Sequence, residues 1–313
     1  MPRIIILGIG GQDARILAKY FIEDFMEVYG VSRTEVPFEN RIAKVNYIVE
    51  DLSNANHFQA LFKIINPDLV FHLAAIHGSS REMKQVERDL AQEMKKCHVE
   101  ITRNILDWQT KSQYCKSLIA LSSFIYTPQI PRQLITGLTE FQPQGVYGQT
   151  KLEALKLIQR YRSTKGVVSL GAILFNHSSS FSKRNFLIPS IASNIERIVQ
   201  KRKIIEIRNS NALVDISKSE IFCKAFKDLM ENEVNQDLIF SSNKLISIRS
   251  LYEECIARID NQLVEFLSFD DEGSNIPSMY GDTSELTAMT KWEGGGDICE
   301  TILEITELEK KRK

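Results

Sequence analysis

The chain has 313 residues, enough for one large domain or two smaller ones, and its 43% hydrophobic and 25% charged content is ordinary for a globular protein. Its formal net charge of −1 argues against a nucleic-acid-binding protein, which would carry a basic excess. No stretch approaches the roughly 20 apolar residues of a membrane helix. The five cysteines, without a Cys-x-x-Cys pair, indicate free thiols in a cytoplasmic protein rather than disulfides or a metal site.

Short apolar runs alternate with helical patterns along the chain, which predicts strand–helix–strand units around a parallel sheet. We expect strands at residues 3–7, 27–32, 46–49, 69–72, 117–121 and 167–174, and helices at 14–25, 55–65, 89–111 and 150–162. After Asn176 a serine-rich loop precedes a helix at 188–201. The predicted fold is α/β: a doubly wound Rossmann domain over 1–175, to which 236–260 returns, and a smaller α/β substrate lobe made of 176–235 and 261–313.

A glycine-rich turn follows the first expected strand directly. Gly8 and Gly11 are followed by Gln12, Asp13 and Ala14. Such glycines let the backbone turn sharply and approach a pyrophosphate, which the N-terminus of the next helix attracts. The glycines alone are a weak motif, but their position after the first strand favours a dinucleotide site over a plain turn.

The end of the second strand indicates which dinucleotide binds. Ser32 and Arg33 stand where an NAD-binding protein would place an acid on the ribose 2′-hydroxyl. Arg33 could instead pair with a 2′-phosphate, so NADP is favoured, and NAD with a solvated arginine is the alternative. After the third strand, Asp51 and Leu52 could hold the adenine, although a helix-capping role for Asp51 or Ser53 is equally compatible with the sequence.

Tyr147 and Lys151 are spaced to share one face of a helix. A nearby ammonium lowers the pKa of a phenol, which suits a tyrosine that exchanges a proton near neutral pH. Tyr161 and Lys165 have the same spacing, but they lie at the end of that helix, before the next strand. We therefore expect the first pair to be the catalytic one.

Ser122 and Ser123 end another apolar strand, at the edge where open parallel sheets bind ligands. A hydroxyl there could bond the reacting oxygen, or it could belong to a simple turn. His77 and His177 also follow strand ends and could face the substrate, whereas the other three histidines are expected to pack against neighbouring elements.

In combination these segments resemble the extended short-chain dehydrogenase/reductases that act on nucleotide sugars. The strings Gly11-Gln12-Asp13 and Leu174-Phe175-Asn176-His177 are most similar to the GDP-mannose 4,6-dehydratase branch. The resemblance spans about the whole chain. It implies an active site between the two lobes, and a homodimer held by a four-helix bundle of helices 89–111 and 147–162.

The resemblance also implies roles for individual residues. Tyr147 would be the acid/base, Lys151 would orient the nicotinamide ribose, and Ser122 would hold the sugar O4. Taken with the patterns above, the expected cofactor contacts are Gly8, Gly11, Gln12, Asp13, Ser32, Arg33, Asp51, Leu52, Ala74, Ala75, Tyr147 and Lys151. The expected substrate contacts are His77, Ser79, Ser123, Asn176, Arg184 and Asn185.

The departures from the family pattern affect the expected reaction. Dehydratases place an acid where this chain has Phe124, and phenylalanine cannot abstract a proton. Ile76-His77 replaces the family's Gln-Ser, and an arginine usual before Asp215 is missing. The sequence therefore favours an oxidoreductase that moves hydride between sugar C4 and a nicotinamide cofactor, as a 4-dehydrogenase or 4-keto reductase of GDP-sugars. A 4-epimerase, a less favoured 4,6-dehydratase and a non-catalytic dinucleotide or sugar-nucleotide sensor are the alternatives.

Overall fold

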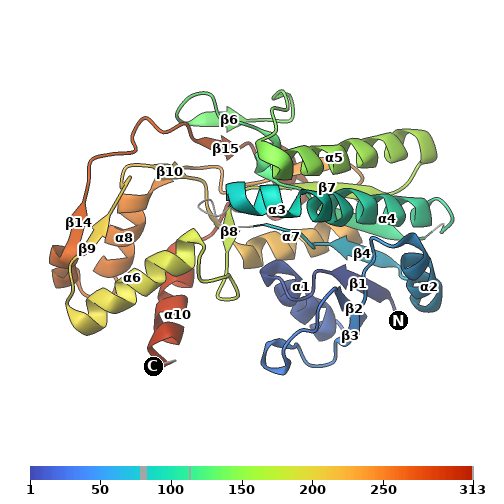
Figure 1. Ribbon diagram of the computed structural model, residues 1–313, viewed down its shortest axis with the longest axis horizontal. Helices are drawn as coiled ribbons and strands as arrows, with labels where there is room; N and C mark the ends of the chain where they lie inside the picture. The colour runs from blue at the N-terminus through green and yellow to red at the C-terminus, as the bar shows by residue number, and fades with distance from the viewer. Residues whose placement is uncertain (78–82, 113, 312–313) are drawn as a thin grey trace.

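The computed structural model describes residues 1–77, 83–112 and 114–311. Its centre is a seven-stranded sheet in the order β12-β7-β5-β4-β1-β2-β3, in which every neighbouring pair is parallel. Helices cover both faces (Figure 1). The predicted doubly wound Rossmann fold is confirmed.

The apolar runs form the strands of the main sheet, as expected. These are β1 (Arg3–Leu7), β2 (Glu27–Ser32), β3 (Asn46–Val49), β4 (Leu69–His72), β5 (Lys116–Ala120), β7 (Ser169–Leu174) and β12 (Asp237–Phe240). Four two-stranded pairs surround it: β6 (Gln133–Ile135) with β15 (Met279–Gly281), β8 (His177–Ser178) with β11 (Ser217–Lys218), β9 (Ile205–Ile207) with β14 (Leu267–Phe269), and β10 (Leu213–Val214) with β13 (Ile246–Ser247).

The helices follow the predicted pattern with one clear difference. They are α1 (Gln12–Glu23), α2 (Ala55–Ile65), α3 (Met83–Lys95), α4 (Ile101–Gln109), α5 (Gly145–Lys165), α6 (Leu187–Lys201), α7 (Ser219–Glu231), α8 (Ile248–Ala257), α9 (Ser284–Met289) and α10 (Ile298–Lys311). The single helix predicted at 89–111 is wrong, because a π-helical segment, Lys96–Glu100, separates α3 from α4. Its extra residue per turn turns Cys97, His98 and Val99 inward together, and such segments are common near functional sites.

Two cores lie on either side of the main sheet. On one face α1 and α7 pack together through residues such as Phe21, Phe222 and Phe226, and on the other face α2, α4 and α5 pack around Phe62 and Trp108. Among the described residues, none of the helices combines the length and apolarity that crossing a bilayer requires.

The smaller lobe has a core of its own, in which α6, α8 and α10 meet through Ile195, Leu251 and Ile302 (left in Figure 1). Two helices pack in the other lobe from the one in which their residue ranges were expected to lie. The apolar face of α7 covers the sheet although α7 falls within 176–235, and α8 joins the lobe although it falls within 236–260.

The glycine turn generates the first prediction. Gly8 has a φ of +86°, and a Cβ there would lie 2.7 Å from the Cα of Ala74. Gly166, which ends α5, has a φ of +65° with nothing within 4 Å of the same added atom. Both alanine variants carry the left-handed backbone strain of roughly 1–2 kcal/mol, but only Gly8→Ala also forces two backbones apart, at a further cost of about 1–3 kcal/mol.

Urea unfolding of both variants measures this difference. Gly8→Ala is expected to lower the free energy of unfolding clearly more than Gly166→Ala does. Equal losses would contradict the close approach of the glycine turn to the end of β4.

Candidate active site

Tyr147 and Lys151 both point inward from the first turns of α5. Lys151 is 3% exposed, and its Nζ donates a hydrogen bond of 2.7 Å to the carbonyl oxygen of Ala120, at the end of β5. The same nitrogen lies 5.8 Å from the centroid of the Tyr147 ring. Burial lowers the pKa of Lys151 to about 8. The lysine therefore links α5 to the sheet directly beneath the tyrosine.

Ser122 lies beside this pair. It caps a short 3-10 helix, its Oγ accepting from the backbone N–H of Phe124 at 3.2 Å, and it shares a hydrogen bond with Tyr147. Burial raises the pKa of Tyr147 to about 12, with the Ser122 bond acting in the opposite direction. The lowered tyrosine pKa expected from the lysine spacing is therefore wrong for this structure, because desolvation of the phenol dominates. The three residues expected to be catalytic nevertheless lie together.

An aromatic cluster is formed by His77, Phe124 and Phe186: His77 and Phe124 pack against the Tyr147 ring, and Phe186 packs against His77. The ring centroid of His77 is 5.0 Å from that of Tyr147 and 5.3 Å from that of Phe186, while Phe124 stands nearly perpendicular to Tyr147 at 5.7 Å. Phe186, which sequence reasoning missed, directly follows Arg184 and Asn185. The aromatic cluster shields the phenol of Tyr147 from water.

His77 is neutral at pH 7 in this setting. Burial, followed by the charge of Lys151, lowers its pKa to about 4. Its Nδ1 atom is buried and has no hydrogen-bond partner among the described residues. An imidazole with one unsatisfied nitrogen beside Tyr147 can bond a polar group, and the expected substrate contact of His77 stays a prediction.

His98, which was expected only to pack, orders the start of α5. Its Nε2 accepts from the N–H of Ile76 at 3.2 Å, so its Nδ1 carries the proton and donates to the Oγ1 of Thr150 at 2.8 Å. Thr150 in turn donates to the carbonyl oxygen of Tyr147. This chain crosses from the π-helical segment to α5, a contact that no local sequence pattern reveals.

The glycine turn is tied to the loop that follows β7. Gln12 accepts hydrogen bonds from Ser182 at 2.6 Å and Ser179 at 3.2 Å, and it donates to the carbonyl oxygen of His177. Asp13 accepts from the Nε2 of His177 at 2.9 Å. Burial opposes a charge on His177, but Asp13 outweighs it and raises the pKa of this imidazole. Gln12 and Asp13 thus tie the glycine turn to this loop, while the second carboxylate oxygen of Asp13 is buried without a hydrogen-bond partner among the described residues. Their expected role in cofactor binding stays a prediction.

The far end of the expected cofactor site lies at the ends of β2 and β3. Arg33 is half-exposed, and its Nη1 is 2.8 Å from Glu93, which also pairs with Lys96. Ser32 donates to the carbonyl oxygen of Thr34.

The alternative prediction, that Asp51 or Ser53 is the N-cap of the following helix, is wrong. The N-cap of α2 is Asn54, whose side chain accepts from two N–H groups of the first turn. Asp51 instead accepts from the N–H and Oγ of Ser53 in the preceding turn. The neighbouring Leu52 is buried, with its carbonyl oxygen bonded by Asn104.

The remaining expected contacts spread over the mouth of the site. Asn176 donates to the carbonyl oxygen of Asp215, and Arg184 forms an exposed ion pair with Glu309 of α10. Ser123 is buried, whereas Ala75 is exposed. Ser79 lies outside the described residues.

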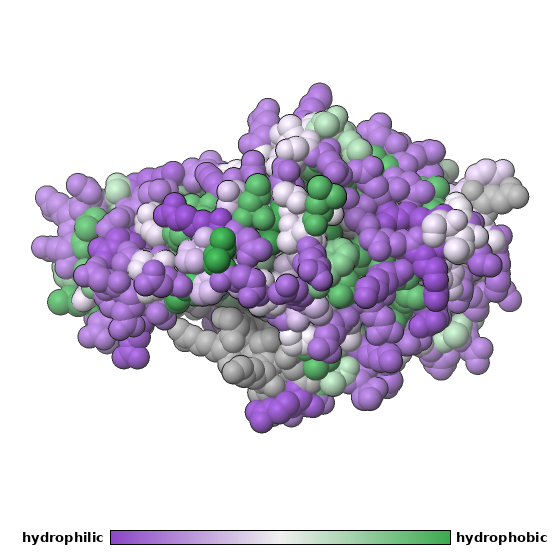
Figure 2. Space-filling view, turned by 90° about the horizontal axis from the view of Figure 1, so that it is seen from above, coloured by the Kyte–Doolittle hydropathy of each residue, from purple (hydrophilic) through white to green (hydrophobic). Residues whose placement is uncertain are grey.

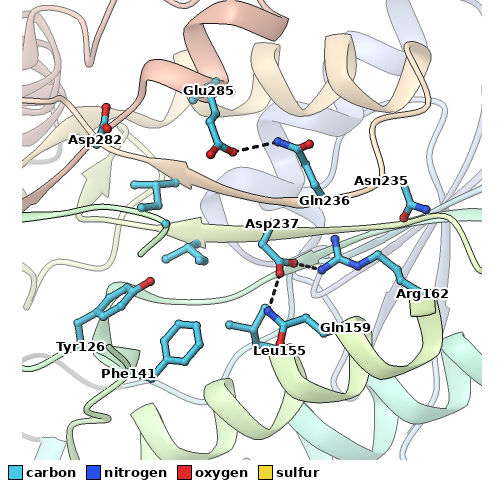
Figure 3. A pocket seen from close by; sticks show the side chains of 14 residues that line it. Tyr126, Phe141, Leu155, Gln159, Arg162, Asn235, Gln236, Asp237, Asp282 and Glu285 are labelled. Atoms are coloured by element: carbon cyan, nitrogen blue, oxygen red, sulfur yellow. Dashed lines mark hydrogen bonds and ion pairs between the residues drawn. The ribbon is translucent and has the colours of Figure 1, made fainter. Parts of the chain in front are cut away.

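A separate cavity of about 330 Å³ lies farther along α5, between that helix and β12. Figure 3 shows Arg162 and Gln159 of α5 directed at Asp237 of β12, with Tyr126 and Phe141 on the opposite side. Its lining includes none of Tyr147, Lys151 and Ser122. The cavity is therefore distinct from the candidate active site.

Known proteins resemble this chain in both sequence and structure. A model of the GDP-mannose 4,6 dehydratase family matches residues 5–288. The chain belongs to this family. It is 24% identical over 292 residues to GDP-mannose 4,6 dehydratase 2 of Caenorhabditis elegans (87% of this chain, 74% of the relative) and 23% identical over 279 residues to GDP-mannose 4,6 dehydratase of Homo sapiens (83% and 73%).

Solved structures agree with the fold. The UDP-glucose 4-epimerase of Thermotoga maritima with UDP-glucose has a TM-score of 0.82 at 14% identity and 99% coverage of both chains. The dTDP-glucose 4,6-dehydratase of Bacillus anthracis in complex with NAD has a TM-score of 0.80 at 13% identity, covering 99% of this chain and 97% of the other. The protein is thus an NAD(P)-dependent extended short-chain dehydrogenase/reductase that modifies nucleotide sugars.

The buried His72, near this site on β4, predicts a pH dependence of stability. Its Nε2 donates to the carbonyl oxygen of Cys97, and burial lowers its pKa from 6.5 to about 3. Between these values the unfolded chain binds a proton that the folded chain does not, so stability is full above about pH 6.5 and falls as the pH falls. Between pH 8 and pH 5 this residue is expected to account for a loss of roughly 2 kcal/mol.

Urea unfolding of wild type and His72→Gln at both pH values tests this prediction. The measurement at pH 8 gives the packing cost of the substitution, because the imidazole is neutral in both states there. The variant should lose less stability on acidification than the wild type. If wild type and variant lost the same free energy of unfolding between pH 8 and pH 5, His72 would not contribute to the pH dependence of stability.

Proposed function

We propose that this enzyme transfers a hydride between C4 of a nucleotide sugar and a nicotinamide cofactor, as a 4-dehydrogenase or 4-keto reductase with GDP-sugars favoured. The cofactor supplies or accepts the hydride when it is bound. The glycine turn fits such a group, because it leads directly into the N-terminus of α1, whose N-cap Gly11 makes no side-chain capping bond, and a helix N-terminus attracts a pyrophosphate.

The chain's own residues handle the proton. Tyr147 exchanges it with the sugar O4, and Ser122, already hydrogen-bonded to Tyr147, holds that oxygen in line. The buried Lys151 ammonium lies on the same face and favours the ionised phenol over the neutral one as the proton leaves. These steps require no further acid or base.

The observation that carries the proposal is the ring of Phe124. It stands 5.7 Å from Tyr147, at the position where the family's dehydratases are expected to place an acid. A phenyl ring cannot remove a proton beside a ketone, so elimination of water lacks its usual base. Hydride and proton transfer at C4 instead use Tyr147, Lys151 and Ser122, and the chain has all three.

A 4-epimerase is the second candidate, because it needs the same three side chains and because a 4-epimerase is among the similar structures. The two activities differ only in whether the ketone leaves or is reduced on its other face.

The mass of the product distinguishes these reactions. Purified protein would be incubated with GDP-sugars and their 4-keto derivatives in the presence of NADPH, NADH or the oxidised cofactors. The proposal predicts a gain or loss of two hydrogens coupled to the nicotinamide absorbance. An epimer of unchanged mass would support the second candidate, and loss of water from a GDP-hexose would contradict the proposal.

Replacing Tyr147 with phenylalanine tests the catalytic assignment. Tyr147→Phe is expected to lower kcat by about 10²–10⁴-fold, because the proton loses its donor, while cofactor binding measured by fluorescence stays intact. Tyr161→Phe is the matched control, since Tyr161 has the same spacing to a lysine but bonds Asp107 outside the site.

Two results would contradict this assignment. Unchanged turnover in Tyr147→Phe would remove Tyr147 from the chemistry and would favour the non-catalytic sensor. An equal loss in Tyr161→Phe would mean that the effect reports stability instead of proton transfer.

We infer that NADP is the favoured cofactor, from the position of Arg33 at the end of β2. A 2′-phosphate would have to compete with Glu93 for the guanidinium. Arg33→Ala should therefore lower kcat/KM for NADPH by roughly tenfold with little change for NADH, and Glu93→Gln should raise it for NADPH. Steady-state kinetics with both cofactors checks this, and a wild-type preference for NADH that Arg33→Ala leaves unchanged would contradict it.

We also propose a homodimer through the helical segments 89–111, which spans the end of α3 to α4, and 147–162 of α5. The α5 side of this interface would be polar. The outer face of α5 presents the exposed residues Gln149, Glu153, Lys156 and Arg160. Figure 2 shows the molecule from this side, with hydrophilic side chains over most of it.

A further inference from the structure

Two of the five cysteines meet in the core of the smaller lobe. The Sγ atoms of Cys255 on α8 and Cys299 in the first turn of α10 lie 2.6 Å apart, in a hydrogen bond that Cys255 donates. Their exposed fractions are 0% and 1%. The other three cysteines lie elsewhere, among the helices and strands of the main sheet, and are buried.

The surroundings of Cys299 favour its thiolate. The hydrogen bond from Cys255 lowers the pKa of Cys299. Arg258 acts in the same direction, whereas burial and the charges of Glu254 and Asp297 oppose it. Arg258 is held in place by an ion pair of 2.5 Å with Asp297, whose other oxygen accepts from the N–H of Cys299. The N-terminal turn of a helix also favours a negative charge.

The three cysteines near the main sheet have the opposite environment. Burial raises the pKa of Cys97, raises that of Cys115 to about 12, and raises that of Cys223 well above its ordinary value. Because the thiolate is the reactive form, oxidation should begin at Cys299.

We propose that Cys255 and Cys299 are a redox modification site, at which a small peroxide such as hydrogen peroxide forms a disulfide between α8 and α10. The oxidant must be small because both sulfur atoms are buried. The inference rests on the contact of the two thiols and is independent of the reaction proposed above.

The chemistry proceeds in two balanced steps. The Cys299 thiolate attacks one peroxide oxygen, the O–O bond breaks, and the departing hydroxide takes a proton to leave water and a sulfenic acid on Cys299. The Cys255 sulfur then attacks the sulfenic sulfur, the S–O bond breaks, and the hydroxide leaves as water with the Cys255 proton. Two thiols lose two electrons, and one peroxide becomes two water molecules.

The bond would join two helices that pack together in the core of the smaller lobe. It would close a segment between residues 44 positions apart. α10 packs along α6, which begins directly after Phe186 of the aromatic cluster, and Arg184 is paired with Glu309 of α10. A bond between α8 and α10 should therefore stabilise the smaller lobe, and with it the position of Phe186 at the start of α6.

The test uses the full-length protein treated with graded hydrogen peroxide, followed by alkylation and peptide mapping without reductant. We expect one cross-linked peptide containing Cys255 and Cys299, reversed by dithiothreitol, while the other three cysteines remain alkylated. We expect the Tm of the oxidised protein to rise by roughly 5–10 °C. Both thiols remaining alkylated after the other cysteines have oxidised would overturn the proposal, and so would a cross-link to a different cysteine.

Two single substitutions refine the test. In Cys255→Ser, Cys299 has no resolving thiol, so dimedone added together with denaturant after peroxide treatment should trap its sulfenic acid, and the rise in Tm should disappear. Cys223→Ser, which removes another buried thiol, should leave both the cross-link and the rise in Tm intact. Because the peptide map of the wild type alone can support or overturn the proposal, poor folding of either variant would not weaken the test.

Discussion

A buried ammonium bonded to one carbonyl group holds the candidate active site together. The Nζ atom of Lys151 donates to Ala120 at the end of β5, and this bond fixes the first turns of α5 against the sheet. Tyr147 and Ser122 then meet because they stand on either side of that link, one on the helix and one just past the strand. Burying a lysine is costly, as its lowered pKa shows, and such a costly group beside a tyrosine and a serine is well suited to catalysis.

The surroundings of Tyr147 join the two lobes at the site. His77 and Phe124 pack against the Tyr147 ring, and Phe186, which stacks on His77, comes from the start of the smaller lobe. The loop leading to it is bonded to the glycine turn through Gln12 and Asp13. The cofactor side and the substrate side of the site are thereby coupled through a few polar contacts. A dry site strengthens every electrostatic interaction within it, which suits hydride and proton transfer.

The sequence predicted the parts of this arrangement that depend on local pattern. Apolar runs located the strands of the main sheet, and the spacing of Tyr147 and Lys151 located one helix face. It could not predict the π-helical segment, because helical periodicity does not reveal a single inserted residue that turns His98 inward. Nor could it show that Asp13 pairs with His177, 164 positions away, or that burial raises the pKa of Tyr147. Those facts depend on long-range packing, which only the folded chain supplies.

The central claim is that this site transfers hydride at sugar C4 without eliminating water, and isotope tracing tests it most directly. The enzyme would be supplied with a 4-keto nucleotide sugar and a reduced nicotinamide cofactor deuterated at its transferable position, and the product examined by NMR. We expect deuterium bonded to sugar C4, with C5 and C6 unlabelled. A product without deuterium at C4 would contradict this claim, and so would a 4-keto-6-deoxy product, with hydrogen moved from C4 to C6, in a parallel incubation with a GDP-hexose.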